Sequence, residues 1–466
     1  MLRLKKEKNC GIILWITENR RRIMADFRWF KVDTAAIMFS SLSDKRWGRT
    51  FRFSAYFKEE IDPVALKRAV KDLMPYYPSI YAYLKRGFFW NYLVSTEKMP
   101  EISEENEFGM KPIVLRTDGT PDFRITYKKN RINIDCSHSL GDGKGIIIYF
   151  KALLARYNEL RKGETGDYAT CEDPSLNIRD SFSDYYRKGE EKATDKSKKA
   201  FHFPEEYEEG VTRLLFAKMS TAKVKELAHK EKMTVTEYLT AILILGIIKS
   251  QQNPIFEPIT IATPVNLRRF FPTMTLRNFT VQTFVTFEPR GRQDVTLREI
   301  LDATRGQLKA QLKKEELQKT INKYGALVNN PVIRIVPGFI KQPVMRAIQK
   351  NTHAGVTTIF TNYGACNLPD SLSPDIERLQ FVNGDTRRYG LAVTCSCIGF
   401  GDVLSLCFSR ANLDTSWYDT CVQILENEGI SVTTDLIDGF AENAEKNTVK
   451  EKLPLSAERI KAYFNL

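Results

Sequence analysis

The sequence predicts an α+β (mixed α/β) protein of two similar lobes, each a sheet with flanking helices. Apolar strands recur in groups, amphipathic helices stand apart from them, and a polar stretch divides this pattern in two. A chain of 466 residues also exceeds one ordinary domain. The sequence shows no repeat of fixed period, so solenoids and propellers are excluded.

The first lobe is expected at residues 24–162. Residues 51–57 alternate as a strand does, and Asp62-Pro63 offers an N-cap and a first-turn proline for a helix. Residues 123–127 and 131–137 flank a Lys-Lys-Asn turn and predict a hairpin. An amphipathic helix follows and is closed by Gly163.

Residues 163–206 are rich in charged residues, Ser and Gly, and predict a solvated connection between the lobes. The second lobe is expected at 207–466. It begins with a strand near 211–217 and two helices with Ser or Thr caps at 220–221 and 234–236. Residues 297–350 are basic and predict mainly helix. Further strands are expected at 259–263, 280–287, 357–362, 391–398 and 403–410.

The net charge of +13 is unevenly placed. Residues 1–23 carry seven basic and two acidic side chains (7 − 2 = +5), which leaves +8 for the rest. We interpret residues 1–23 as a basic extension. A mildly basic surface suits nucleic acid, anionic lipid or a phosphate-bearing cofactor. Because no nucleic-acid-binding motif accompanies the charge, we expect no nucleic-acid partner.

Hydropathy and cysteine usage indicate a compartment. The mean hydropathy is −0.34, and no apolar run approaches the ~20 residues of a spanning helix. The apolar segment 11–16 is short and precedes three arginines, so it is a poor signal peptide. The eight cysteines form no CxxC pair, and the four histidines stand apart from them, so we expect reduced thiols and no metal. We therefore predict a cytoplasmic protein, without a transmembrane segment, and a monomer.

The segment Ser137-His138-Ser-Leu-Gly-Asp142-Gly143 is the candidate site. In the strand before it the even positions are apolar and the odd positions polar, and His138 has the parity of the apolar face. The histidine is thus expected at the strand end, on the buried side, before a glycine-rich turn. A pKa of about 6.5 suits a general base near neutral pH. Asp142 is expected to pair with an arginine and fix the turn.

Other interpretations compete for this segment. A single histidine on an apolar face is most often a core residue, but His-x-x-x-Asp-Gly is expected by chance only about 0.01 times in such a chain. The glycines at 141, 143 and 145 are similar to a phosphate-binding turn, although the third is one residue early and no Lys-Ser or Lys-Thr follows. A Cys136–His138 nucleophilic dyad is conceivable, and a His/Asp metal site lacks a third ligand.

On these residues the chain resembles the chloramphenicol-acetyltransferase and condensation-domain superfamily, whose motif is HHxxxDG. Within it, the chain most resembles bacterial alcohol acetyltransferases. Ser137 replaces the first histidine, and the plant-type DFGWG element is absent. The similarity runs from Met24 to about Gly429. It includes residues 29–36, 77–79, 84–90, 264–268 (PVNLR) and 361–364 (TNYG).

The resemblance implies two lobes around a tunnel that admits acyl-CoA and an alcohol or amine acceptor from opposite faces. His138 would be the general base of an acyl transfer, most simply from acetyl-CoA, without an acyl-enzyme. Asp142 and Gly143 complete the catalytic motif, Arg268 would pair with Asp142, and Asn362 is a candidate oxyanion donor or tunnel residue. The alternative is a non-catalytic or carrier-protein-dependent condensation-like module. Because the sequence at hand shows no separate stretch of about 80–100 residues that resembles a carrier domain, we expect the enzyme rather than the module.

Overall fold

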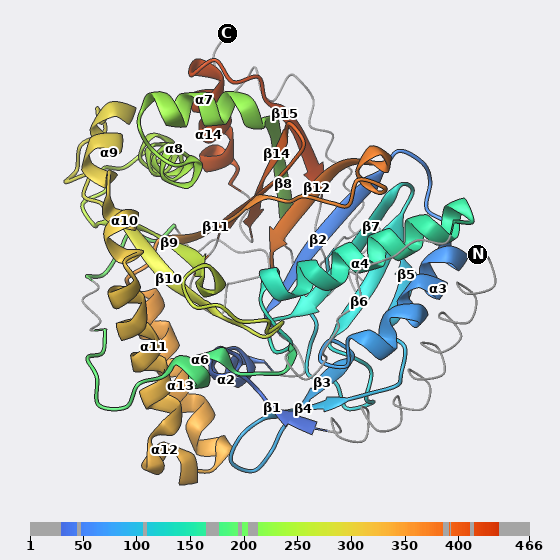
Figure 1. Cartoon of the computed structure of the whole chain (residues 1–466). Helices are drawn as coiled ribbons and strands as arrows, with labels where there is room; N and C mark the ends of the chain where they lie inside the picture. The colour runs from blue at the N-terminus through green and yellow to red at the C-terminus, as the bar shows by residue number, and fades with distance from the viewer. Residues whose placement is uncertain are drawn as a thin grey trace, which may run out of the picture.

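The computed structural model describes residues 29–43, 48–105, 110–164, 177–193, 198–203, 213–384, 391, 393–410 and 414–437. The extension expected at 1–23 lies outside these residues. The structure has three sheets, and helices cover the two larger ones (Figure 1), so the predicted α+β class is confirmed.

A five-stranded sheet of order β12-β2-β7-β6-β5 forms the core of the first lobe. The predicted hairpin is present, with Ile125 opposite Ile134. Two adjacent helices cover this sheet (Figure 1); the first is capped by Asp62, and the second ends at Gly163 in the left-handed conformation. The elements are β2 (Thr50–Phe57), α3 (Pro63–Leu73), β5 (Glu101–Glu104), β6 (Phe123–Lys128), β7 (Arg131–Ser137) and α4 (Gly143–Lys162).

β7 is buried on both faces, which differs from the simple alternation of its sequence. Asp135, on the polar face, accepts hydrogen bonds from Arg52 at 2.5 and 2.9 Å and from Arg124 at 2.8 Å. Although burial opposes it, these arginines hold the pKa of Asp135 below its ordinary value. The odd positions are therefore polar because they face a buried ionic network.

A seven-stranded sheet of order β10-β9-β11-β13-β14-β8-β15 forms the second lobe. The buried helix α8 begins at a capping box formed by Thr234 and Glu237 and packs against the C-terminal helix. The elements are β8 (Arg213–Ser220), α7 (Thr221–Lys230), α8 (Val235–Ser250), β9 (Ile259–Asn266), β10 (Thr280–Phe287), β11 (Thr358–Ala365), β13 (Val393–Phe400), β14 (Val403–Arg410), α14 (Ser416–Asn427) and β15 (Thr433–Ile437).

The second half of the chain also supplies a strand to the first sheet. β12 (Ile376–Asn383) pairs antiparallel with β2 along its whole length. It is joined to the second sheet as well, because Asn383 Nδ2 donates to Thr361 Oγ1 at 3.1 Å and Ser396 Oγ donates to the Phe381 carbonyl at 2.6 Å. The residues expected as a separate second lobe, 207–466, therefore contribute to both sheets.

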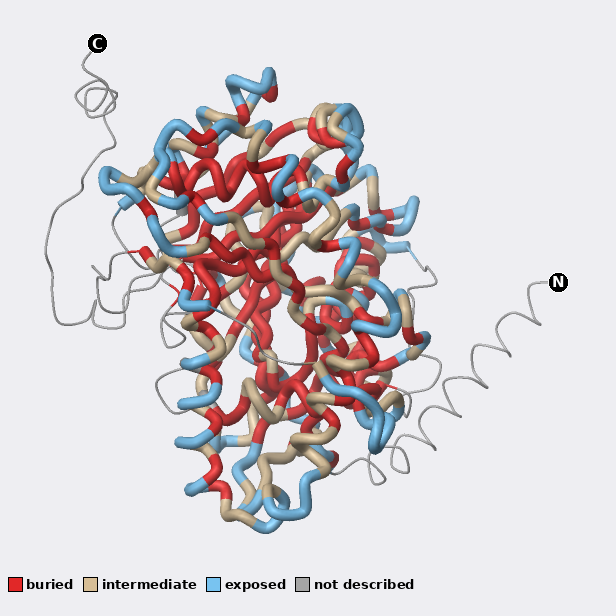
Figure 2. Tube along the Cα trace, turned by 90° about the vertical axis from the view of Figure 1, so that its left-hand side faces the viewer, coloured by how far each residue is buried: buried red, intermediate tan, exposed pale blue. Residues whose placement is uncertain are grey.

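A helical layer and a small sheet (β1-β4-β3) complete the described chain (Figure 1). Buried residues run through the interior in Figure 2, while the end formed by α11–α13 carries more exposed ones. The elements are β1 (Trp29–Lys31), α2 (Thr34–Leu42), η1 (Met74–Tyr76), β3 (Ala82–Lys85), β4 (Tyr92–Ser95), α6 (Ser181–Tyr185), η2 (Leu267–Arg269), α9 (Leu297–Thr304), α10 (Gln307–Gln311), α11 (Lys314–Asn329), α12 (Pro331–Ile335), α13 (Gly338–His353) and η3 (Ser373–Asp375).

The connection expected to be solvated is partly folded into the protein. Phe182 of α6 is fully buried and packs with Leu267, Phe279 and Leu317. Its neighbour Asp180 accepts a hydrogen bond from Thr34 Oγ1 at 2.8 Å. Phe182 therefore anchors α6 in the protein, whereas residues 187–192 of the same connection are exposed.

The described residues contain no single helix long and apolar enough to cross a membrane. The pair α7 and α8 meets the length and composition requirement only together, with a bend of 88° between them.

Candidate active site

His138 lies at the end of β7, where the strand passes into the turn before α4. Its backbone N–H donates to the Arg49 carbonyl at 2.9 Å, which continues the β2–β7 pairing by one residue. The residue is half-buried, unlike the fully buried residues at 132–136. The histidine is therefore fixed by the sheet and is less buried than the strand residues that precede it.

Asn278, between η2 and β10, determines how the imidazole of His138 is protonated. Its Nδ2 donates to Asp33 Oδ2 and to the His138 carbonyl, both at 2.9 Å. Both amide hydrogens are thus used, and Oδ1, which lies 3.4 Å from His138 Nδ1, acts as an acceptor. The neutral imidazole therefore carries its hydrogen on Nδ1, which leaves the Nε2 lone pair free to take a proton.

A buried polar cluster of Asp33 and Arg277 holds Asn278 in place. Asp33 Oδ2 lies 3.2 Å from Arg277 Nη2, and Arg277 also donates to the Ser139 carbonyl at 3.3 Å. Asp33 Oδ1 caps α2 by accepting from Ala36 N–H at 2.7 Å. Burial raises the pKa of Asp33 to about 6, against the effect of Arg277. Above that pH the carboxylate links α2, the histidine loop and Asn278.

Aromatic side chains form the walls around the imidazole. The rings of Phe51 and Phe39 lie 4.5 and 4.8 Å from it, centroid to centroid. Burial, followed by the positive charge of Arg49, lowers the pKa of His138 from its ordinary value of 6.5 to about 3. The contact between His138 Nδ1 and Asn278 Oδ1 partly offsets this decrease, because it raises the pKa of His138. The imidazole is therefore neutral at physiological pH, the form that a general base requires.

Asp142 is the N-cap of α4 and also reaches the second half of the chain. Its Oδ1 accepts from Gly145 N–H at 2.9 Å. Its Oδ2 accepts from Arg268 Nη1 and from Phe279 N–H, both at 2.8 Å. Arg268 donates in addition to the carbonyls of Thr275 at 3.1 Å and Arg277 at 2.6 Å. The structure thus brings Asp142 and Arg268 together, away from the imidazole, in the position of a fastener for the turn.

The glycines of the motif have different steric roles. A Cβ at Gly141 would lie 2.3 Å from the Leu276 carbonyl oxygen, and one at Gly145 would lie 1.9 Å from it. A Cβ at Gly143 would meet only the rings of Phe53 and Phe381, no closer than 3.5 Å. The close approach of the two halves of the chain therefore depends on Gly141 and Gly145. Gly143, which the sequence singled out, is the first residue of α4 and has room for a methyl group.

Cys136 is poorly suited to act as a nucleophile. Its side chain is fully buried, and burial raises the pKa of its thiol well above the ordinary value. Its Sγ lies 3.5 Å from the Ser137 carbonyl. A buried, protonated thiol cannot supply the thiolate that a Cys–His dyad needs, so the geometry argues against the dyad.

Asn362 lies on β11, where its amide is already engaged. Its Nδ2 donates to Thr236 Oγ1 at 2.9 Å, and its Oδ1 accepts from Gly364 N–H at 2.8 Å. The asparagine that the structure places beside the histidine is Asn278. Sequence reasoning missed it, together with Asp33 and Arg277. The one signal for Asp33 was its place in the segment 29–36 that supports the family resemblance.

No family model matches the chain, and no curated protein matches it. Several solved structures share its fold. Polyketide synthase associated protein 5 from Mycobacterium tuberculosis is 12% identical, with a TM-score of 0.59 over 85% of this chain and 96% of that one. TRI101 from F. sporotrichioides, complexed with coenzyme A and T-2, is 10% identical, with a TM-score of 0.59 over 86% of this chain and 99% of that one. The nonribosomal peptide synthetase FmoA3 is 14% identical, with a TM-score of 0.54 over 86% of this chain and 42% of that one.

The chain therefore has the fold of these solved structures, and the predicted mixed fold of sheets with flanking helices is confirmed. At such low identity the likeness concerns the fold, and activity must be argued from the site.

Proposed function

We propose that this chain is an acyl-CoA-dependent acyltransferase that moves an acyl group, with acetyl as the simplest case, to an alcohol acceptor. The observation that carries the proposal is the state of His138: a neutral, half-buried imidazole with Nδ1 directed at Asn278 and Nε2 free. The coenzyme A complexes of TRI101, which has the same fold, support the choice of donor.

The proposed reaction uses His138 twice. Nε2 removes the proton of the acceptor hydroxyl while its oxygen attacks the thioester carbonyl carbon, and a tetrahedral intermediate forms. When the intermediate collapses, the C–S bond breaks and the imidazolium returns the proton to the thiolate of coenzyme A. An acyl-enzyme is not required. Asp142 and Arg268 act by positioning, because they fix the turn that carries the histidine.

Cations near the motif suit a phosphate-bearing donor. Lys144 lies on α4 directly after the turn, Lys151 lies two helical turns further along the same helix, and Arg268 is paired with Asp142 at its N-terminus. Burial, followed by the charge of Lys151, lowers the pKa of Lys144, which indicates that these cations are close enough to repel one another. A polyanionic ligand would relieve this repulsion.

Acceptor dependence tests the proposal. Purified protein with acetyl-CoA or another short acyl-CoA should release free coenzyme A only when an alcohol or amine is added. The thiol should be separated chromatographically, because the chain has eight cysteines that react with colorimetric reagents. If a broad panel of donors and acceptors gave no release and calorimetry detected no coenzyme A binding, the carrier-protein-dependent condensation module, which the likeness to FmoA3 keeps open, would replace this proposal.

A further inference from the structure

The helix α13 has its polarity reversed with respect to an ordinary surface helix. Between residues 339 and 348 every exposed position is apolar: Phe339, Ile340, Pro343, Val344, Ala347 and Ile348. The buried positions of the same span are Lys341 and Met345. A surface helix of a globular protein normally buries its apolar face and exposes its polar one. The apolar side chains of α13 are instead exposed. The helix lies at one end of the molecule (Figures 1 and 2).

Neighbouring segments extend this apolar surface. Val332 and Ile335 of α12 are 66% and 72% exposed, and Phe88, in the loop between β3 and β4, is 66% exposed. The loop is fixed to α13, because Gly338 N–H donates to the Phe88 carbonyl at 2.6 Å and the ring centroids of Phe88 and Phe339 lie 6.4 Å apart. We call the exposed residues Phe88, Val332, Ile335, Phe339, Ile340 and Val344 the α13 face.

The charged residues of the segment that carries α12 and α13 have one sign. Between residues 317 and 369 the chain has six lysines and arginines and no aspartate or glutamate. Among them, Arg334 is exposed on α12, and Arg346 lies on the flank of α13. A protein partner with a mixed surface would not need such a bias. The apolar side chains and the surrounding cations together match a binding surface of another kind. Such a surface is apolar at its centre, negatively charged at its boundary and extended in two dimensions.

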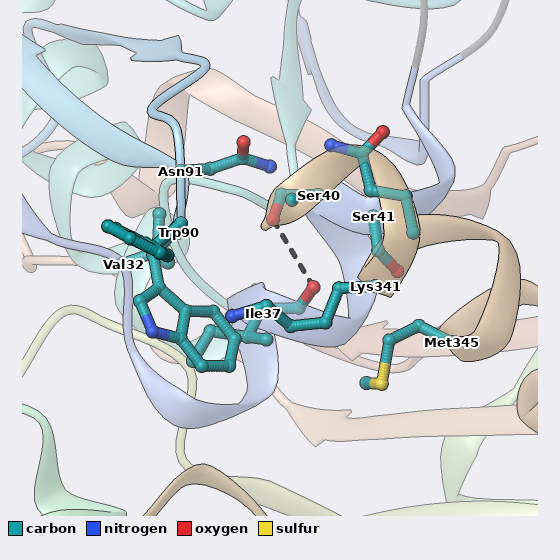
Figure 3. Close-up of a pocket in the computed structure, with 11 residues that line it drawn as sticks. Val32, Ile37, Ser40, Ser41, Trp90, Asn91, Lys341 and Met345 are labelled. Carbon is teal, nitrogen blue, oxygen red and sulfur yellow. Dashed lines mark hydrogen bonds between the residues drawn. The ribbon is translucent and has the colours of Figure 1, made fainter. Parts of the chain in front are cut away.

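A small pocket beneath the face adds a further cation, Lys341 (Figure 3). Lys341 enters it from α13 with its Nζ 3.3 Å from the ring centroid of Trp90. The Lys341 side chain is 7% exposed, and its Nζ has no hydrogen-bond partner among the described residues. Burying an ammonium group in this way is costly unless an anion or water approaches it. The pocket measures about 30 Å³, which is room for water and not for a headgroup, so an anion would reach the lysine only from the surface.

We infer that the α13 face is an interfacial membrane-binding surface that seats this chain on anionic lipid bilayers. The outward side chains enter the boundary between headgroups and acyl chains, and the surrounding cations contact lipid phosphates. If the chain is the acyltransferase proposed above, membrane binding has a consequence for its substrate: the acceptor would be an amphiphilic alcohol resident in the membrane. This consequence rests on the proposed function.

The position of the face relative to His138 gives that consequence a structural basis. α13 packs on α2, with Arg346 Nε donating to the Ser41 carbonyl at 3.2 Å and Gln349 Nε2 donating to the Met38 carbonyl at 2.8 Å. On its other side, α2 presents Phe39 to the imidazole. Only two helices therefore separate a bound bilayer from the candidate base.

Vesicle flotation of the full chain tests the inference. The protein should float with vesicles of phosphatidylcholine mixed with phosphatidylglycerol, and less with phosphatidylcholine alone. Added salt should weaken the binding, because the phosphate contacts are screened. The double variant Phe339→Ser/Val344→Ser should bind about a hundredfold more weakly, since each apolar side chain withdrawn from lipid is worth about one factor of ten. Both side chains are more than half exposed, so its melting temperature should stay unchanged.

A matched control removes the same number of exposed apolar side chains elsewhere. Val64 and Phe256 are 76% and 72% exposed, and Val64→Ser/Phe256→Ser should bind vesicles as the unaltered protein does. His138→Ala should also bind normally, so vesicle binding can be judged even if acyl transfer fails. The inference would be overturned if the protein did not float with vesicles, or if both double variants lost vesicle binding to the same extent. It would also be overturned if the protein did not bind vesicles and Phe339→Ser/Val344→Ser changed it from a dimer to a monomer. That last result would identify the α13 face as an interface between two copies of the chain.

Discussion

Asp142 and Arg268, 126 residues apart in sequence, form an ion pair with 2.8 Å between Oδ2 and Nη1. Their side chains are 3% and 10% exposed. The pair joins the N-terminus of α4, in the first lobe, to the segment after β9, in the second. Its geometry supports a structural role: the carboxylate serves backbone donors and the guanidinium, not a substrate.

Breaking this pair should destabilise the protein. Asp142→Ala and Arg268→Ala should each lower the free energy of unfolding by about 3–5 kcal/mol, because each leaves a buried charge without its partner. The double variant should lower the free energy of unfolding by much less than the sum of the two single losses, as measured by chemical denaturation. Arg298→Ala is the control, since its ion pairs are 64% exposed on the arginine side and worth at most about 1 kcal/mol. Additive losses would show that the two residues are not coupled.

The hydrogen bond from His138 to Asn278 should matter for turnover more than for binding. Asn278→Ala removes the acceptor that holds the Nδ1 tautomer, so kcat should fall by about tenfold, the value of one hydrogen bond, with KM little changed. Asn362→Ala is the paired variant. A larger loss of kcat in Asn362→Ala than in Asn278→Ala would contradict this assignment and identify Asn362 as the oxyanion donor.

The pH profile should reflect the depressed pKa of His138. A histidine base works only when neutral, and the pKa of His138 lies at about 3, so its protonation should lower kcat/KM only as the pH approaches about 3. Burial is the main cause and the charge of Arg49 the second. Arg49→Gln should therefore raise the pKa and move the acid limb to higher pH. An acid limb that is unmoved, or that lies above pH 7 in the unaltered protein, would refute this explanation.

Alanine substitutions should separate the glycines of the turn. Gly145→Ala and Gly141→Ala place a Cβ against the Leu276 carbonyl and should cost about 1–3 kcal/mol of stability or more. Gly143→Ala has ordinary contact distances inside a helix and should be neutral, or stabilise by up to about 1 kcal/mol. Melting curves of the three variants decide the matter. If Gly143→Ala were the most damaging, that glycine would have a role beyond packing.

Local elements were well predicted because their signals are local. The β6–β7 hairpin, the cap at Asp62 and the end of α4 at Gly163 follow from turn and capping residues. Strands β10 and β14 begin and end where the alternation does. The placement of His138 at the strand end followed from the same alternation.

Long-range relationships could not be predicted in the same way. Asn278 meets Asp33 across 245 residues, and its neighbours in sequence give no sign of either contact. The pairing of β12 with β2 and the ionic network around Asp135 also depend on how the whole chain folds. The pairing of Asp142 with Arg268 was expected only through the resemblance.

The most direct test compares the turnover of two variants, each altered at one residue near the end of strand β7. In the presence of acyl-CoA and an accepted alcohol, His138→Ala should lose at least ~10² of the rate of coenzyme A release, as expected for a general base. Cys136→Ala, altered two residues away in a buried position, should retain activity, and mass spectrometry of the unaltered protein should find no acyl-enzyme. An inactive Cys136→Ala together with an acyl group trapped on Cys136 would contradict the account and establish a cysteine nucleophile.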